Sequence, residues 1–389
     1  MKLVYCTNIW NHHQGPVATE LAKLLGPGEF RLMLHQPLDH HYSLDRIRMG
    51  WNLVPPDAPW ILGPPATCAQ VDYSQYSKLA KEAEALVYTG MEPFISQELL
   101  VVRAKKGKIN IRMGERRFKV PLPLWKRLSV REWRCRLLNH IWLESANVNI
   151  LTMGHGCVED MHYYMACKGR IWRWGYLTKT SETCHIKQTK EKVSIGWCGR
   201  LIDWKRVDLL IDAVALLPFD IRSKCKVTIV GEGDQEFILK KRVERLEMTG
   251  LIEFRQSLPA EEIADFMREL DIYVFPSNRK EGWGAALLEA MDKGCAVIAN
   301  EAAGSTLEVV QHEVNGLVFK DDDVERLSQC LSRLILDEDE RRKFGLEAWR
   351  TIQNWSPSSG ARRLVKLIDA LRSGDLYGVP TEGLCANVG

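Results

Sequence analysis

In the second half of the chain, short runs of apolar residues alternate regularly with segments that have the mixed polar and apolar pattern of helices. The runs are 193–198 (VSIGWC), 226–230 (KVTIV), 271–276 (DIYVFP) and 295–299 (CAVIA). Strands that are apolar along their whole length, rather than at every second residue, are typical of parallel sheets that helices cover on both faces. Because helical segments separate the runs, the sequence predicts a Rossmann-like α/β domain.

The first half of the chain shows the same alternation less clearly. A loop followed by a helix is predicted at 15–25, and the polar, charged stretch 178–192 is interpreted as a linker. Strand candidates lie at 3–6, 29–34, 85–89, 108–113 and 149–153. The 389 residues, of which 46% are hydrophobic, are enough to fill the cores of two domains of ordinary size.

Composition and the N-terminal residues indicate a globular protein of the cytoplasm. Charged residues make up 26% of the chain, the formal net charge is +3, and no apolar run reaches the 18 or more residues of a membrane span. The start, MKLVYCTNIWNHH, lacks the long apolar region and the small-residue cleavage site of a secretion signal. We therefore expect a cytoplasmic protein.

Neither the cysteines nor the paired histidines have the spacing of a metal site. The 11 cysteines are scattered without a Cys-x-x-Cys pair, which suits small buried side chains in a reducing compartment. The histidine pairs at 12–13 and 40–41 have no acids or thiols at ligand spacing and are interpreted as turn or loop residues. The acidic run 321–323 (DDD) is interpreted as the start of a helix. We therefore predict no metal site.

Three loops follow strands of the predicted second sheet, and in such sheets ligands bind beyond the carboxyl ends of the strands. In the first loop, GRLIDWKR, Arg200 and Lys205 provide two cations, which is what a diphosphate needs. The second loop, GEGD, begins at Gly231, where the absence of a side chain lets a ligand approach the backbone. The third loop is part of EGWGAALLEAM and holds two carboxylates.

Glu281 and Glu289 stand eight positions apart in EGWGAALLEAM. Gly282 and Gly284 disfavour a helix, whereas the following AALLEAM favours one. The sequence therefore predicts Glu281 in a loop and Glu289 inside the next helix. The N-terminus of that helix would lie between them, and its free N–H groups and partial positive charge suit a phosphate. The segment thus predicts a site for an elongated, phosphate-centred ligand.

The second half of the chain resembles the retaining nucleotide-sugar glycosyltransferases of family 4. The residues that carry this resemblance are GRLIDWKRVDLLIDAVALL, VTIVGEGD, DIYVFPSNRKEGWGAALLEAMDKGCAVIA and EVVQHEVNGLVF. In the first half, NIWNHHQGPVATELAK is the faint equivalent of the family's glycine loop and first helix. The resemblance implies the GT-B architecture, an α/β fold in which two Rossmann-like domains face each other across a cleft.

The resemblance also implies a domain organisation. An acceptor-side Rossmann-like domain is expected at 1–185, and a nucleotide-sugar-binding Rossmann-like domain at 186–355. The helix pattern at 356–373 suits the family's final helix, which crosses back to the first domain. The last residues, 373–389, are Gly-rich and are expected to be loose.

For the donor site, the resemblance implies a role for each matched residue. Arg200 and Lys205 would hold the diphosphate of the donor. Glu289 would bind the ribose, and Glu281 would contact hydroxyl groups of the transferred sugar. The further donor-binding positions are Gly15, Gly231, Arg255, Gly282, Trp283, Gly284, Leu287 and Leu288. No metal or other cofactor is implied, because the two cations and the helix N-terminus take its place.

The first domain departs from the family pattern, in which many relatives place a histidine near the sugar. His12 is the candidate catalytic residue for this role, and His155, in LTMGHG, is the alternative. Packing in a loop is the other interpretation of both histidines. Glu115, in RMGERRFK, is a candidate acceptor contact.

The activity that the resemblance implies is transfer of a sugar from a nucleoside-diphosphate sugar to a glycan or glycolipid acceptor, with retention of the anomeric configuration. Breaking the sugar–phosphate bond builds positive charge on the sugar and negative charge on the diphosphate, so a carboxylate and two cations favour that state. A non-catalytic nucleotide-sugar-binding subunit, and a nucleotide-sugar epimerase or phosphorylase on a similar scaffold, stay open as alternatives. A dinucleotide dehydrogenase is excluded, because no Gly-x-Gly-x-x-Gly follows the first strand of either domain.

A basic stretch lies in the first half of the chain. Residues 101–140 contain thirteen Lys or Arg against two Glu, interleaved with Trp125 and Trp133. One interpretation is a solvated helix face. The other is an amphipathic helix that takes an anionic acceptor or rests on an anionic membrane, which would make the protein peripheral at the inner face of the membrane. No recognised nucleic-acid-binding module surrounds the stretch, so we expect no nucleic-acid partner.

Overall fold

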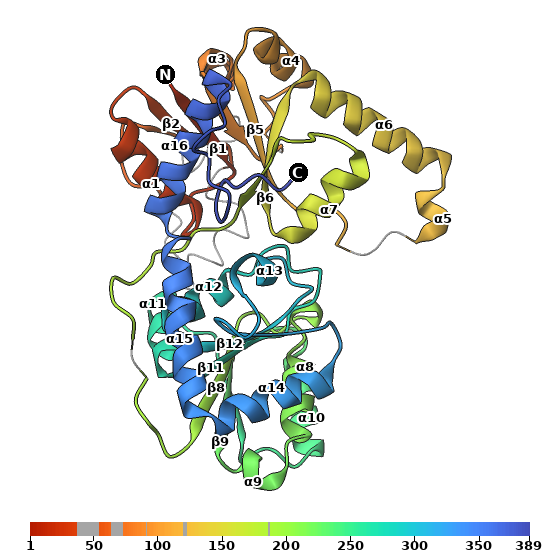
Figure 1. Cartoon of the computed structure of the whole chain (residues 1–389), viewed down its shortest axis with the longest axis vertical. Coiled ribbons are helices and arrows are strands. Elements are labelled where there is room, and N and C mark those ends of the chain that lie inside the picture. Colours follow the sequence, from red (N-terminus) through yellow and green to blue (C-terminus); the bar gives the residue numbers. More distant parts are fainter. Residues whose placement is uncertain (37–53, 64–72, 91, 120–122, 186) are drawn as a thin grey trace. The chain divides into compact units, whose positions relative to one another are not determined.

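The chain forms two compact units: Met1–Lys179 together with Trp355–Gly389, and Thr180–Asn354, which we call the first unit and the second unit. The sequence predicts boundaries after residues 185 and 355, and the structure divides the chain after residues 179 and 354. The histidine pair at 40–41 lies outside the described residues. The structure is a computed structural model that describes residues 1–36, 54–63, 73–90, 92–119, 123–185 and 187–389 (Figure 1).

The first unit is built on a parallel sheet. In the described part of the unit this sheet has seven strands in the order β3-β2-β1-β4-β5-β6-β7. All residues of β1, β4 and β6 are buried, as expected of strands that helices cover on both faces. The sequence does not predict β3 or β7. The strands are β1 (Leu3–Thr7), β2 (Phe30–Leu34), β3 (Ile61–Leu62), β4 (Ala85–Tyr88), β5 (Ile109–Glu115), β6 (Val148–Met153) and β7 (Ile171–Trp174).

Helices connect the strands of the first unit and cover its sheet. They are α1 (Gln14–Leu25), α3 (Ser74–Glu82), α4 (Gln97–Lys105), α5 (Leu124–Arg127), α6 (Val130–Ser145), α7 (His155–Tyr164) and α16 (Pro357–Ser373). The last of these, α16, comes from the end of the chain and packs against α1 (Figure 1). Ser356 is the N-cap of α16, because its hydroxyl group accepts the Ser359 N–H at 3.3 Å.

The expectation of a loose C-terminal tail is wrong for its last residues, 384–389, whereas 373–378 are exposed. Leu384 and Cys385 are fully buried, and the tail adds hydrogen bonds to the edge of the sheet. The Cys385 N–H donates to the Arg173 carbonyl at 2.8 Å, and the Arg173 N–H donates to the Ala386 carbonyl at 2.9 Å. The exposed edge of β7 needs partners for its backbone groups, and the tail supplies them.

The second unit has a parallel sheet with the order β10-β9-β8-β11-β12-β13. The alternation of strands and helices from residue 193 onward confirms the predicted Rossmann-like domain. The strands are β8 (Val193–Cys198), β9 (Cys225–Val230), β10 (Ile252–Arg255), β11 (Ile272–Phe275), β12 (Ala296–Asn300) and β13 (Leu317–Phe319). The helices are the short 3₁₀ turn η1 (Asp203–Lys205), α8 (Val207–Ala215), α9 (Phe219–Arg222), α10 (Glu236–Arg245), α11 (Ala260–Glu269), α12 (Ala285–Asp292), α13 (Thr306–Val309), α14 (Val324–Leu336) and α15 (Glu338–Gln353).

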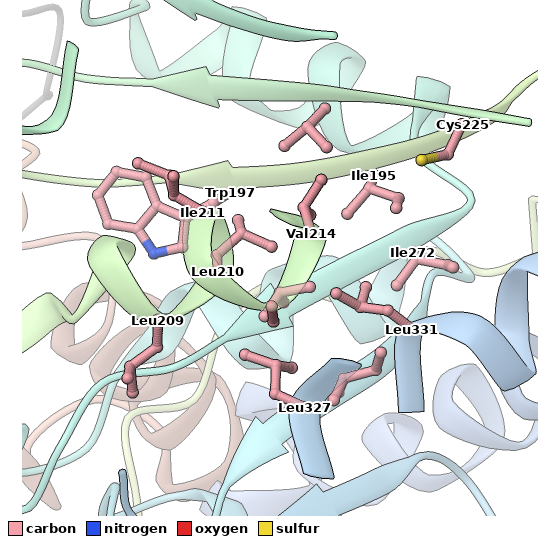
Figure 2. Packing of buried hydrophobic residues seen from close by; sticks show 14 of the residues in the cluster. Ile195, Trp197, Leu209, Leu210, Ile211, Val214, Cys225, Ile272, Leu327 and Leu331 are labelled. Carbon is pink, nitrogen blue, oxygen red and sulfur yellow. The ribbon is translucent and has the colours of Figure 1, made fainter. Parts of the chain in front are cut away.

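The core of the second unit lies between the sheet and these helices (Figure 2). Trp197 of β8 is covered by α8, whose Leu210 and Val214 lie one helical turn apart, and α14 adds Leu327 and Leu331 at the same spacing. Each of these side chains stabilises the fold by roughly 1.5–3 kcal/mol through burial. On the other face, α12 and α15 pack against β12.

None of the helices in the described part of the chain is both long enough and apolar enough to span a bilayer.

Candidate functional site

The strand order of the second unit reverses between β8 and β11. These two strands pair with each other, while β9 and β10 continue the sheet on one side and β12 and β13 on the other. In open α/β sheets, ligands bind beyond the carboxyl ends of the strands at such a reversal. Here the loop after β8 begins with Gly199 and Arg200, and the loop after β11 covers 276–284. Most of the sequence-predicted donor residues therefore lie at one edge of this sheet.

Backbone hydrogen bonds join the loop after β8 to the loop after β9. The Gly199 N–H donates to the Val230 carbonyl at 3.0 Å, and the Leu201 N–H donates to the Glu232 carbonyl at 2.8 Å. Gly231 has φ +142°, and a Cβ atom on it would lie 1.8 Å from the Gly199 carbonyl oxygen. A side chain at position 231 would force the two loops apart. Glycine is therefore required here by the close approach of the loop after β8.

Lys205 and Glu281 form an ion pair between two of the loops. Lys205 ends η1, and Glu281 lies 76 positions further along, in the loop after β11. Their side chains are only 17% and 14% exposed, so salt screens this pair less than it screens a surface pair. The Asn278 N–H donates to the Trp204 carbonyl at 3.0 Å, which holds the same two loops together.

Two further arginines lie at this edge in different environments. Arg200 is exposed, and among the residues that the structure describes it forms no ion pair with a carboxylate. Arg255, at the end of the edge strand β10, donates to both carboxylate oxygens of Glu253, at 2.8 and 3.0 Å. These hydrogen bonds raise the pKa of Arg255. Its backbone carbonyl accepts the Gly231 N–H at 3.0 Å, so the backbone of Arg255, rather than its guanidinium, borders the loop after β9.

The two acids of EGWGAALLEAM lie where the sequence predicts them, Glu281 in a loop and Glu289 inside α12. Gly284 precedes the helix with φ +90°, and a Cβ atom there would lie 2.2 Å from the Phe275 ring. No side chain caps the start of α12, so its first N–H groups are available to a ligand at the helix's positive end.

The apolar residues around this helix start are part of the interior. Trp283 is 1% exposed, and Leu287 and Leu288 are fully buried. Gly282 is buried as well. The side chains of Trp283, Leu287 and Leu288 therefore pack inside the second unit, which leaves the backbone of this segment to border a ligand.

A further loop, 301–306 (EAAGST), follows β12 and is not among the segments predicted from the sequence. The Gly304 N–H donates to the Glu281 carbonyl at 3.1 Å, so this loop rests directly on the segment that carries the acid. The hydroxyl groups of Ser305 and Thr306 are buried and have no hydrogen-bond partner in the described ranges. A run of small and polar residues directly after a buried strand is the signal that could have found the loop.

The acidic run 321–323 leads into the start of helix α14, as the sequence predicts. The Asp323 side chain accepts the Arg326 N–H at 2.8 Å and caps α14. Asp321 accepts the side-chain amide of Asn300 at 2.7 Å.

The candidate residues of the first unit follow the carboxyl ends of its strands. His12 lies between β1 and α1, with its ring centroid 3.6 Å from that of His13. Gly15 is in the first turn of α1 rather than in a loop, because the Asn11 side chain accepts the N–H of residue 14 at 2.8 Å and starts the helix there. His155 begins α7.

Glu115 ends β5, at the middle of the described sheet. Its carboxylate accepts the Tyr176 hydroxyl at 2.8 Å and pairs with Lys119 at 3.3 Å. The carboxylate is therefore held in place by groups of the same unit. Its assignment as an acceptor contact stays a prediction.

The Glu289 side chain is half-buried, and the partial loss of contact with water raises the pKa of its carboxyl group to about 7, against a smaller opposing effect of Lys293. A carboxyl group whose pKa is raised by folding destabilises the folded state at high pH, because the unfolded chain has already released the proton. This loss of stability begins near pH 4.5, the ordinary pKa of a glutamate carboxyl group, and is complete above about pH 7.

We therefore expect Glu289→Gln to raise the melting temperature by several degrees at pH 8.5 and to change it little at pH 4.5. Differential scanning fluorimetry across this pH range measures the effect. The exposed Glu262→Gln on α11 is the control and should give no pH-dependent difference. Equal shifts at both pH values for Glu289→Gln would contradict the burial of its charge.

Comparison with known proteins finds a family match within the second unit. Residues 184–350 match the model of the glycosyl transferases group 1. An uncharacterized glycosyltransferase of Methanocaldococcus jannaschii is 31% identical over 172 residues, 43% of each chain. A GDP-mannose-dependent alpha-(1-6)-phosphatidylinositol monomannoside mannosyltransferase of Mycobacterium tuberculosis is 27% identical over 194 residues, 48% of this chain and 49% of that one. The chain thus spans less than half the length of these curated relatives.

Solved structures resemble the chain over nearly its whole length. HepE of Anabaena, crystallised with UDP, is 16% identical and has a TM-score of 0.66, over 95% of this chain and 100% of that one. A glycosyltransferase of Rickettsia africae is 14% identical and has a TM-score of 0.67, over 95% and 98%. These likenesses confirm the predicted fold, two Rossmann-like α/β domains of the GT-B architecture.

Proposed function

We propose that this chain is a glycosyltransferase that moves a sugar from a nucleoside-diphosphate sugar to a glycan or lipid-linked acceptor, with retention of the anomeric configuration. The observation that carries the proposal is the edge of the second unit where the strand order reverses. There the Lys205–Glu281 pair, Arg200 and the N-terminus of α12 lie on neighbouring loops. All of them fall within 184–350, the segment that matches the glycosyl transferases group 1.

A nucleoside-diphosphate sugar fits these groups by charge. Arg200 and Lys205 are cations that can neutralise the diphosphate as it leaves, and the free N–H groups of α12 add to them. Glu289 is the carboxylate proposed to bind the ribose. HepE was crystallised with UDP-glucose, and the mycobacterial relative is named for its dependence on GDP-mannose. Both names support this class of donor.

In the structure, the charges of Lys205 and Glu281 satisfy each other. We propose that the donor separates them, so that the Lys205 ammonium group meets a phosphate oxygen and the Glu281 carboxylate accepts hydroxyl groups of the sugar. This exchange costs little, because each charge gives up one buried partner for another. Since the cations already stabilise the leaving diphosphate, we propose a reaction without a metal ion or other cofactor.

Three parts of the proposal come from the sequence resemblance. They are retention of configuration, His12 as the catalytic group of the first unit, and Gly15 as a donor contact. The cytoplasmic location likewise stays a prediction.

Incubation of the full chain with UDP, GDP, ADP and dTDP sugars tests the proposed function. We expect one donor to raise the melting temperature and to be hydrolysed slowly without an acceptor, at a rate that EDTA does not change. Proton NMR of the transfer product should show the anomeric configuration of the donor. Binding without turnover under any acceptor would identify a nucleotide-sugar-binding subunit instead. A changed sugar still attached to its nucleotide would identify an epimerase.

A further inference from the structure

The outward face of α6 carries an apolar stripe, which we define as Val130, Trp133, Leu137 and Ile141. These residues follow each other at intervals of three and four, so they lie on one face of the helix. Such a stripe normally packs against the core of a domain. Here the four residues are 86%, 63%, 42% and 50% exposed, so the stripe faces solvent. Figure 1 shows α5 and α6, in yellow, at the margin of the first unit, away from α1 and α16.

Polar contacts on the opposite face fix this orientation of α6. Arg136 donates to the Tyr163 carbonyl at 2.9 Å, and Glu132 accepts the Tyr163 hydroxyl at 3.1 Å. The His140 ring lies 2.8 Å from the Met165 carbonyl oxygen, and Leu143 is buried. Because these contacts all lead to α7 and the sheet, the stripe is held outward by the folded unit.

Cations surround the stripe, whereas the acids of α6 point elsewhere. Lys126, Arg127, Arg131 and Arg134 are exposed, and within the described ranges none of them forms an ion pair. Of the acids on the helix, Glu132 is engaged by Tyr163, and Glu144 pairs with Arg170 at 2.5 Å. Within the described residues of α5 and α6, the charged side chains that form neither an ion pair nor a side-chain hydrogen bond are therefore all basic.

The segment before α6 extends the same surface. Trp125 and Leu128 are 70% and 77% exposed, and the Lys126 ammonium group lies 5.2 Å from the centroid of the Trp125 ring. Exposed tryptophans with adjacent cations are typical of the boundary between lipid headgroups and acyl chains. We call the surface formed by α5 and α6 the basic apolar surface.

We propose that the basic apolar surface docks on a lipid bilayer that contains anionic headgroups. Its charge complements an anionic plane, its stripe supplies side chains that enter the boundary region, and its tryptophans anchor there. A second copy of the chain fits less well, because the cations of two such surfaces would face each other. The inference adds a partner to the proposed function and does not depend on donor chemistry.

Vesicle flotation of the full chain tests this proposal. The probes are phosphatidylcholine vesicles with and without phosphatidylglycerol. We expect binding only to the anionic vesicles, and weaker binding at high salt, because salt screens the cations. Arg131→Gln with Arg134→Gln should lower the affinity roughly 25-fold, at about fivefold for each cation removed. Trp133→Ser with Leu137→Ser should abolish binding.

A second exposed cation and aromatic ring provide a matched control. Lys241 lies 5.9 Å from the centroid of the Phe237 ring on α10, as Lys126 lies near the Trp125 ring, but Lys241 also pairs with Glu244 at 2.7 Å. We expect Phe237→Ser with Lys241→Gln to leave vesicle binding unchanged, whereas Trp125→Ser with Lys126→Gln should lower it at least tenfold. Unchanged melting temperatures and donor hydrolysis show that the variants are folded.

Three results would overturn the proposal. The first is equal binding to neutral and anionic vesicles, and the second is equal loss in the control variant and the α5 variant. The third is a stripe variant that turns a dimer into a monomer, measured by light scattering, without any change in vesicle binding. That result would assign the surface to a second copy of the chain. Because donor hydrolysis is measured in parallel, failure of docking is distinguishable from failure of the proposed activity.

Discussion

We expect replacement of Lys205 or Glu281 with alanine to abolish the proposed sugar transfer, with a loss of kcat/KM of at least roughly 10²–10³-fold for each variant. Without Lys205, the leaving diphosphate loses a cation in a partly buried site, where charges interact strongly. Without Glu281, the sugar would lose the carboxylate that we propose to stabilise positive charge on it. Steady-state kinetics with the donor found in the nucleotide-sugar panel measures both effects.

The neighbouring pair in the same loops is the matched control. Lys280 pairs with Asp203 at 2.9 Å, but these side chains are 38% and 57% exposed. Lys280→Ala should therefore change kcat/KM less than about threefold and the stability by less than about 0.5 kcal/mol. The double exchange Lys205→Glu with Glu281→Lys is a more stringent test. It restores the ion pair between the loops but places the carboxylate at position 205 and the ammonium group at position 281. We expect it to recover the melting temperature and not the activity. Recovery of activity would show that the pair serves only to hold the loops.

Arg103→Met destabilises the first unit by about 3–5 kcal/mol, the range for removing one member of a buried polar network. The Arg103 side chain is 1% exposed and lies between α4 and the sheet. It donates to the Asn110 side chain and to the carbonyl groups of Ala83 and Ile109, each at 2.8 Å, and to the Ala80 carbonyl. Burial lowers the pKa of Arg103 to about 10, which leaves it charged at neutral pH. Methionine would fill the space and leave these buried acceptors without donors.

Urea unfolding of the full chain measures this effect. The exposed Lys105→Met, on the same helix, is the control and should shift the stability by less than about 0.5 kcal/mol. Arg103→Lys should lie between the two, because an ammonium group cannot reach all the acceptors of the planar guanidinium. Equal destabilisation by Arg103→Met and Lys105→Met would contradict the structural role of Arg103.

The second unit was largely predictable from the sequence because its strands are buried on both faces. Continuous runs such as KVTIV can then be recognised without knowledge of their neighbours. The same holds for the loop position of Glu281 and the helical position of Glu289, which depend on local preferences of glycine and alanine. The pairing of Lys205 with Glu281 was not predictable, because contact across 76 positions depends on the order of strands in the sheet.

The first unit was less predictable for physical reasons that particular residues show. β7 has the sequence IWRW, in which Arg173 interrupts the apolar run, and its edge is completed by a Gly-rich tail that resembles a disordered end. The direction of the α6 stripe was also out of reach. Periodicity shows that Trp133 and Leu137 share a face, but only packing shows whether that face meets a core or solvent. Because exposed apolar side chains lie on the outward face of α6, that face is not simply a solvated polar surface.

Isothermal titration calorimetry of the full chain tests whether the second unit binds a diphosphate. A nucleoside diphosphate is compared with the matching nucleoside on the wild type, Arg200→Ala and Lys205→Ala. We expect each variant to lose at least about tenfold in affinity for the diphosphate and to keep its affinity for the nucleoside, because each substitution removes one charge-assisted contact to a phosphate. Equal diphosphate affinity in all three proteins would contradict it.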